Sequence, residues 1–433
     1  MPKGKKKGIL LFTGGRRADS RPPSDEEYDT GDNLSTASIL SDDQSGSIPE
    51  EGADEVDEVS AQEQFEEKLK DCIDGLSQKS AQGRKTCLEG IIKAFSKKYL
   101  YEFLQDRKMT VSDALIRCLK KGNGDEQALA AKCYSLLCIQ LGPEAESLVM
   151  ELQPVLLTII ADNSACLKAR GECAITVVMC VFIASSDIEQ VAKVLEVLEC
   201  VFKLSFRKGD GSIPNHSLEL CKLHAHCLQA WSLLMTVASS NVVHVMVEKY
   251  LAKFTDFLHS SDLELRIVAG ETIALIYELG RDEEDDFGGS LLDDLCEILK
   301  NLATDSHKYR AKRDRKQQRS SFRDILRAVQ DGDAPEMTVR FGQEHLEIYS
   351  WIGKIKYNAF CHALTSGMYQ HLQKNPLVRD VFELGEPIIV GSNPAQKQSK
   401  WERTMYNAAV FKARTKARSR CRDKRSVTAN GGD

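Results

Sequence analysis

The chain has 433 residues, of which 42% are hydrophobic, and a net charge of −6 at pH 7. This composition is ordinary for a soluble protein of two or three domains. Its longest apolar run, Ala174 to Ala184, is about half of what a membrane span requires, and the apolar run at Ile9 to Phe12 is too short for a signal peptide. The fourteen cysteines are scattered without a CxxC pair, which is typical of reduced thiols in the cytosol or nucleus.

Residues 1–60 form the first predicted region. They are rich in Ser, Gly, Asp and Glu and poor in large apolar side chains, so we expect a disordered tail. Between Asp19 and Glu67 the chain has seventeen acids and a single base, Arg21. Ser24 and Ser41 precede acidic residues and are possible phosphorylation sites, although such patterns also arise by chance.

Residues 61–305 show apolar side chains at i, i+3, i+4 and i+7, with almost no strand alternation. One helical signature recurs: LRIVAGETIAL at 265–275 can be laid over LKARGECAITV at 167–177, which pairs Arg266 with Lys168. Weaker copies surround Arg84, Leu129 and Cys221, roughly 40 to 50 residues apart. The spacing predicts an all-α, armadillo/HEAT-like solenoid with a long concave surface; the alternative is an irregular helical bundle.

One group of side chains in this region could in principle hold zinc. Cys221, His224, His226 and Cys227 lie within seven residues, but on one continuous predicted helix, where their directions diverge. We therefore expect packed thiols and a half-exposed histidine pair, and no metal. The chain also lacks HExxH, Walker-type and dinucleotide-binding motifs. These absences favour a protein that is not an enzyme and has no cofactor and no small-molecule substrate.

Residues 306–395 are predicted to form a smaller C-terminal helical module. It begins with KYRAKRDRKQQR at 308–319, which has seven bases and one acid, Asp314. The alternative is a solvated helix face, where isolated charges would contribute little. A nucleic-acid surface is the reading we favour, with candidate contacts at Lys308, Arg310, Lys312, Arg313, Arg315, Lys316 and Arg319.

Residues 396–433 are predicted to form a projecting basic helix and tail. Trp401 and Met405 share a face that could anchor the helix to the body. Eight of the fourteen residues from 412 to 425 are Lys or Arg, and alternate charges fall on opposite sides of a helix. This arrangement suits a site with phosphates on several sides, with candidate contacts at Lys412, Arg414, Lys416, Arg418, Arg420, Arg422, Lys424 and Arg425. A nuclear-localisation signal is the alternative.

Neither basic segment resembles a base-reading motif, so recognition would be of shape and backbone, as in structured RNA. Cations held near phosphates release counterions, and binding should weaken as salt rises.

Four segments carry a more specific resemblance: LATDSHKYRAKRDRKQQRSSFRDILRAV at 302–329, YNAAVFKARTKARSRCRDKR at 406–425, YEFLQDRKMTVSDALIRCLKKG at 101–122 and LCIQLGP at 137–143. They closely resemble the interferon-related developmental regulator family, and the resemblance covers nearly everything from about residue 60 onward. It implies a helical-repeat regulator without enzymatic activity. It also implies one of two roles: binding idle ribosomes with the C-terminal helix in the mRNA path, or nuclear transcriptional co-regulation through deacetylase-containing complexes.

The basic segments, taken with what the family resemblance implies, lead us to expect a cytoplasmic and nuclear scaffold that binds ribosomes and ribosomal RNA through its basic C-terminal segments and represses translation by occupying the mRNA channel. The alternative is a nuclear co-regulator of proliferation and differentiation that acts through transcriptional corepressor proteins. Neither hypothesis involves a membrane.

Overall fold

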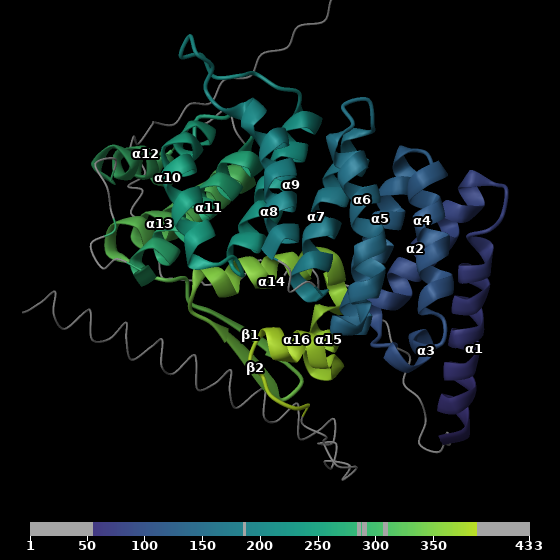
Figure 1. The fold of residues 1–433 in the computed structure, drawn as a ribbon. Coiled ribbons are helices and arrows are strands. Elements are labelled where there is room, and N and C mark those ends of the chain that lie inside the picture. Colours follow the sequence, from purple (N-terminus) through teal and green to yellow (C-terminus); the bar gives the residue numbers. More distant parts are fainter. Residues whose placement is uncertain (1–54, 185–187, 284–286, 288–291, 306–310, 388–433) are drawn as a thin grey trace, which may run out of the picture. The chain divides into compact units, whose positions relative to one another are not determined.

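The computed structural model describes residues 55–184, 188–283, 287, 292–305 and 311–387 (Figure 1). Within this part of the chain the first fifteen helical elements follow one another without a strand. Their bounds are α1 Glu55–Gly75, α2 Ala81–Lys97, α3 Tyr101–Gln105, α4 Lys108–Lys121, α5 Gly124–Leu141, η2 Gly142–Ala145, α6 Glu146–Ala161, α7 Leu167–Ala184, α8 Ile188–Phe202, η3 Lys203–Ser205, α9 Leu218–Met235, α10 Ser240–Phe257, α11 Leu263–Glu283, α12 Leu292–Thr304 and α13 Lys312–Asp331.

The helices stack as a solenoid. We call α2, α5, α7, α9, α11 and α13 the first row, because each contacts the next (Figure 1). Each first-row helix also packs against the helix that precedes it as a pair: α1 with α2, α4 with α5, α6 with α7, α8 with α9, α10 with α11 and α12 with α13. The predicted all-α, armadillo/HEAT-like solenoid is confirmed. No helix that the structure describes is both long and apolar enough to span a lipid bilayer.

A recurring arginine joins three of the first-row helices to the end of the preceding helix or to the turn that follows it. Arg84, Arg170 and Arg266 are each the fourth residue of a first-row helix, α2, α7 and α11. Arg84 Nη1 donates to the carbonyls of Gln78 and Lys79, both at 2.9 Å. Arg170 Nε donates to Ile160 O at 2.9 Å, and Arg266 Nη1 to Ser260 O at 2.5 Å. These bonds satisfy a carbonyl of the last turn of α6, and carbonyls of the turns that follow α1 and α10.

The equivalence of these arginines corrects the register of the sequence overlay. Arg266 corresponds to Arg170, two residues beyond the Lys168 that the overlay pairs with it. Lys168 instead lies on the surface and contacts Asp125.

A β-hairpin follows the last repeat and adds to the predicted helical module. Strands β1 Met337–Phe341 and β2 Glu344–Ile348 pair antiparallel, with Val339 opposite Leu346. Gly342 makes the turn with φ +56°, a conformation that glycine adopts without strain. The alternating pattern buries Val339, Phe341, Leu346 and Ile348 and leaves the other face in solvent.

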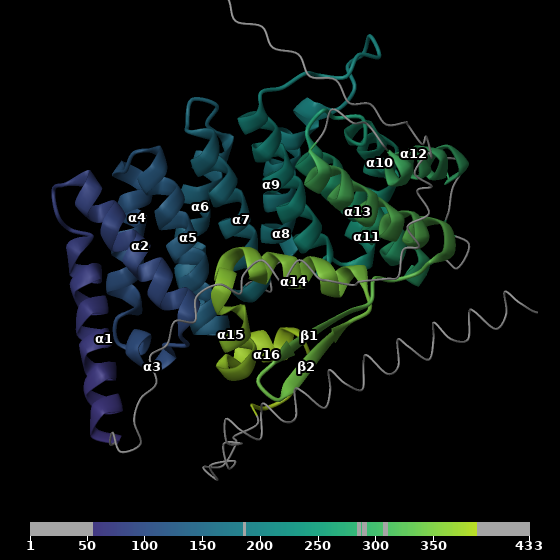
Figure 2. The ribbon, with the colours of Figure 1, turned by 180° about the vertical axis from the view of Figure 1, so that it is seen from behind.

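The chain then turns back along the first row. The elements α14 Trp351–Leu364, η4 Thr365–Gly367, α15 Met368–Lys374 and α16 Pro376–Val381 form what we call the return segment. Helix α14 crosses the first row and contacts α11, α9, α5 and α2 (Figure 2). Phe360 of α14 lies edge-on to Phe182 of α7, with ring centroids 6.2 Å apart. The first-row surface along which α14 runs is therefore covered by the chain itself.

Both ends of the return segment are held by polar contacts. Glu278 of α11 accepts hydrogen bonds from the backbone N–H groups of Trp351 and Ile352, at 2.6 and 2.9 Å, which caps the start of α14. At the other end, His371 Nε2 bonds to Phe95 O at 3.1 Å and Asn375 Nδ2 donates to Ile139 O at 3.0 Å. Backbone carbonyls of α2 and α5 therefore fix the position of α15 and α16.

Candidate nucleic-acid interface

Helix α13 contains five of the residues predicted to bind RNA: Lys312, Arg313, Arg315, Lys316 and Arg319. It begins at Lys312 without a side-chain cap and ends at Gly332, whose φ of +77° closes the last turn through a bond from its N–H to Ala328 O. Cations in the first turn oppose the helix dipole, which favours acids there. The basic start is thus not explained by the stability of the helix.

One face of α13 is buried against the solenoid. Phe322, Ile325 and Val329 are fully buried, with Gln318 and Ala328 beside them. Gly270 of α11 allows this close approach, because a Cβ at that position would lie 2.7 Å from Ile325 Cδ1 and 2.9 Å from Phe322 Cε1. Apolar packing therefore fixes which face of α13 points to solvent.

Polar contacts hold the same helix at its seventh residue and in its last turn. Buried Gln318 accepts a hydrogen bond from Arg266 Nη2 at 2.8 Å and donates to Asp305 Oδ2 at 3.0 Å. Arg281 of α11 donates to Ala328 O at 2.5 Å and to Val329 O at 2.6 Å, which satisfies carbonyls of the last turn. The helix is consequently a fixed platform on the last repeat.

The solvent side of α13 carries a line of five cations. We call these residues the basic stripe: Lys312, Lys316, Arg319, Arg323 and Arg327. They are separated by 4, 3, 4 and 4 residues. At 100° per residue they therefore fall within an arc of about 80° around the helix axis, and the line extends over about 22 Å along it. All are exposed except Arg319, which is half-buried.

Few acids neutralise the basic stripe. Arg327 Nη2 lies 3.3 Å from Asp324 Oδ1, an exposed pair that contributes about 0–1 kcal/mol. With the residues that the structure describes, the other four cations of the stripe form no ion pair. Like charges at i and i+4 destabilise a helix by about 0.2–0.5 kcal/mol per pair, so the stripe costs stability unless an anion binds it.

The structure divides the predicted RNA contacts of this segment. Lys312, Lys316 and Arg319 belong to the stripe, whereas Arg313 and Arg315 lie on its two flanks. Arg323 and Arg327 were missed by the sequence analysis because they lie beyond the dense run of bases and beside Asp324. Their spacing of four residues from each other, and of four from Arg319, was the signal that could have found them.

The remaining predicted site residues lie outside the described residues. They are Lys308, Arg310, the helix anchors Trp401 and Met405, the cationic segment with Lys412, Arg414, Lys416, Arg418, Arg420, Arg422, Lys424 and Arg425, and the possible phosphosites Ser24 and Ser41.

The histidine and cysteine group on α9 is part of the core. His224 is fully buried, not half-exposed as the sequence suggested, and its Nδ1 lies 2.6 Å from Ser205 Oγ. Burial lowers the pKa of His224 to about 4, which keeps the ring neutral. His226 instead packs edge-on against His362 of α14, with ring centroids 5.8 Å apart. Among the residues that the structure describes, no three His, Cys, Asp or Glu side chains are placed to hold a metal ion.

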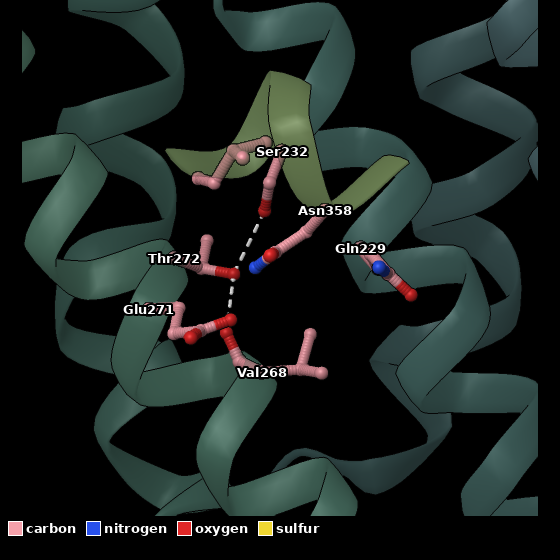
Figure 3. Close-up of a pocket in the computed structure, with 7 residues that line it drawn as sticks. Gln229, Ser232, Val268, Glu271, Thr272 and Asn358 are labelled. Atoms are coloured by element: carbon pink, nitrogen blue, oxygen red, sulfur yellow. Dashed lines mark hydrogen bonds between the residues drawn. The ribbon is translucent and has the colours of Figure 1, made fainter. Parts of the chain in front are cut away.

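A small cavity lies where α14 crosses α9 and α11 (Figure 3). Its volume of about 10 Å³ is close to the least that holds one water molecule. Thr272 Oγ1 lies 2.8 Å from Ser232 Oγ and donates to Val268 O at 2.7 Å. Glu271 at its edge pairs with Lys354 at 3.2 Å. These polar groups satisfy one another, and the space is too small for a substrate.

A larger pocket of about 190 Å³ lies between the α1–α2 turn, α4 and α5. Its buried carboxylate, Glu126, accepts two hydrogen bonds from Arg84, at 2.5 and 2.9 Å. The hydrogen bonds from Arg84 lower the pKa of Glu126, so the carboxylate is ionised and fully engaged. Glu126 and Arg84 therefore form a structural ion pair, and the carboxylate is a poor general base.

Comparisons with known proteins identify similar sequences. A family model described as interferon-related developmental regulator matches residues 33–330, and one described as interferon-related protein conserved region matches residues 375–426. Interferon-related developmental regulator 1 of Homo sapiens is 44% identical over 417 residues, which cover 95% of this chain and 92% of that protein. Interferon-related developmental regulator 2 of Mus musculus is 44% identical over 379 residues, covering 87% and 86%.

Among solved structures, the matches include engineered repeat proteins. A designed armadillo repeat protein has a TM-score of 0.37 and 16% identity, and covers 60% of this chain and 99% of that one. Another engineered protein has a TM-score of 0.39 and 14% identity, covering 60% and 97%.

Proposed function

Because the chain belongs to the interferon-related developmental regulator family, we propose that it is a scaffold without enzymatic activity that binds ribosomes in the cytoplasm and represses translation. In this proposal the body of the protein docks on ribosomal RNA and the cationic segment at 412–425 occupies the mRNA channel. A fraction of the protein molecules also enters the nucleus.

The basic stripe of α13 is the observation that carries this proposal. Four of its five cations have no anionic partner among the described residues, and the helix that presents them is held at Gln318 and in its last turn. An unpaired line of cations on a fixed surface is suited to phosphates. The eight cations of the 412–425 segment add a second basic element. A polyanion as large as ribosomal RNA can satisfy both.

The absence of a catalytic constellation among the described residues supports a binding role. The carboxylates that line the described cavities, Glu126, Glu271 and Asp256, are paired with Arg84, Lys354 and Arg207, and His224 is neutral and buried. An enzyme needs a nucleophile or a base that a substrate can reach.

Sucrose-gradient sedimentation of the full chain at physiological salt tests the proposal. One variant has all eight Lys and Arg residues at 412–425 changed to Gln. A matched control exchanges Lys for Arg and Arg for Lys at the same eight positions, so the charge is unchanged. We expect the wild type and the control to migrate with ribosomes and to inhibit translation of a reporter mRNA in a cell lysate. The neutralised variant should lose most of both properties. If the wild type stays at the top of the gradient, ribosome binding is wrong.

Transcriptional co-regulation through corepressor proteins is the competing hypothesis, with the basic end acting as a nuclear signal. A partner peptide could reach the first-row surface beneath α14 only if that helix moved away. RNA crosslinking in cells separates the two hypotheses. Strong crosslinks to ribosomal RNA support the scaffold on the ribosome, whereas loss of nuclear localisation in the neutralised variant with unchanged RNA affinity supports the co-regulator.

A further inference from the structure

We propose that the basic stripe of α13 binds the phosphate backbone of duplex RNA, with Arg323 and Arg327 as contacts that extend the site beyond its basic N-terminal half. This inference rests on the proposed function, because it takes RNA as the polyanion. It adds which surface of the body makes the contact, which residues complete it and which form of RNA is bound.

The geometry of the stripe matches a row of phosphates. Neighbouring cations are separated by 3 or 4 residues, which is about 4.5–6 Å of helix rise, and the whole line extends over about 22 Å. Each strand of a B-form DNA duplex places one phosphate about every 3.4 Å of helix axis, and the phosphates of A-form RNA are no farther apart along the axis. A straight helix of this length can therefore face several phosphates at once along the edge of a groove.

The surface around the stripe favours duplex over single-stranded RNA. Proteins that bind single strands stack bases on exposed aromatic side chains. The only aromatic residue of α13 is Phe322, and it is fully buried. Duplex RNA is instead recognised by shape and by contacts to phosphate and 2′-hydroxyl groups, which arginine and lysine can make without stacking.

The stripe is also organised before any ligand arrives. Phe322, Ile325 and Val329 fix the rotation of α13, while Arg281 holds its last turn through Ala328 O and Val329 O. Arg323 and Arg327 project from this fixed half of the helix. Because the backbone of this half of the helix needs no ordering on binding, the conformational entropy that is lost there is that of the side chains.

Fluorescence anisotropy with the purified full chain tests the proposal. The probes are a fluorescein-labelled 20-base-pair RNA duplex and one of its strands alone. The test variant is Arg323→Gln with Arg327→Gln. The matched control is Lys68→Gln with Lys70→Gln, which removes the same charge from exposed positions of α1, in the first pair of the solenoid. Each pair of substitutions is made in the wild type and in the chain with residues 412–425 neutralised, so that the two basic elements are measured separately.

We expect the test variant to bind the duplex at least tenfold more weakly in both backgrounds. The slope of log Kd against log salt concentration should fall by about 2, one for each lost phosphate contact. The control should change neither quantity. Thermal melting confirms that the test variant is folded, since Arg327 makes only an exposed ion pair and Arg323 makes none among the described residues.

Three outcomes overturn the inference. The first is an unchanged affinity of the test variant for the duplex. The second is an equal loss of duplex affinity in the control. The third is a single strand that binds the wild type more tightly than the duplex does, with the loss of affinity in the test variant confined to the single strand. If ribosome sedimentation is still lost when residues 412–425 are neutralised, the proposed function stands and only the stripe is wrong. If the wild type binds neither duplex RNA nor ribosomes, both proposals fail.

Discussion

Arg379 of α16 and Glu344 of β2 form a bidentate ion pair at the turn end of the hairpin. Arg379 Nη1 and Nη2 donate to the two carboxylate oxygens of Glu344 at 2.9 and 2.8 Å. The arginine side chain is only 1% exposed, and it also donates to Leu372 O, Leu384 O, Gly385 O and Glu386 O. One buried guanidinium thus joins the hairpin to the end of the return segment.

Replacing Arg379 with Met should lower the free energy of unfolding by about 3–5 kcal/mol, because it leaves Glu344 and several carbonyls without their donor. Urea denaturation measures this change, and hydrogen exchange should show the largest loss of protection in β1 and β2. Arg340→Met, on the exposed face of β1, is the control and should change stability by no more than about 0.5 kcal/mol. Equal urea midpoints for Arg379→Met and the wild type would contradict the structural role of this pair.

Stability should fall in mild acid because of buried histidines. Burial lowers the pKa values of His224, His362 and His371 to about 4, below the ordinary value of 6.5. The native state therefore binds fewer protons than the unfolded state between pH 6.5 and 4, and its stability is complete above pH 6.5 and is lost as the pH falls. Each histidine contributes a slope of about 1.4 kcal/mol per pH unit in this window.

Urea denaturation at several pH values between 7.5 and 5 measures the slope. His371→Gln should remove about one histidine's share of it, because Gln has no proton to gain. A free energy of unfolding that does not change between pH 6.5 and 5 would show that these rings are already protonated in the native state or reach solvent.

Gly367→Ala should strongly destabilise the contact between η4 and α2. A Cβ at Gly367 would lie 1.5 Å from Ser96 O, a backbone atom that cannot rotate away. We expect a loss of about 1–3 kcal/mol or more, the usual cost of forcing extra volume into a packed site. Gly209→Ala is the matched control, since a Cβ there meets nothing within 4 Å. Similar melting temperatures for both variants would mean that η4 does not approach α2 this closely.

Thiol reactivity should follow burial. Cys166 and Cys200 are exposed, whereas burial raises the pKa of the thiols of Cys133, Cys173 and Cys227. Because the thiolate is the reactive form, brief treatment with iodoacetamide at pH 8 should modify the first two and leave the other three intact. Mass spectrometry of peptides reads the result, and the same treatment in urea should modify all five. Rapid modification of Cys133 in the native protein would contradict its place in the core.

The solenoid was predictable because its signal is local. Apolar side chains recur at helical spacing over 61–305, and that pattern alone indicates stacked helices. The hairpin was not predicted because MTVRF and EHLEI are only five residues each, too short for alternation to stand out. The return segment was missed for a different reason. Contacts such as Glu278 with Trp351 join residues 73 positions apart, and no local pattern encodes them.

The candidate site was found in part by counting charges. Counting located the run at 308–319 but treated all seven bases as equivalent. Once Phe322 and Ile325 fix the buried face of α13, the helical positions separate these bases: Lys312, Lys316 and Arg319 fall in one line, whereas Arg313 and Arg315 lie on its two flanks. The same two residues bring in Arg323 and Arg327, whose positions become meaningful only once the helix is oriented.

The bond between His371 and Phe95 O has a consequence for how the protein is made. These residues are 276 positions apart in the chain. Synthesis at 5–20 residues per second separates their emergence by roughly 14–55 s, far longer than a helix needs to form. During that interval the surface of α2 that finally receives α15 has no partner from its own chain. The nascent protein therefore passes through a period in which its early repeats depend on chaperones, or on their own pairwise packing, to avoid aggregation.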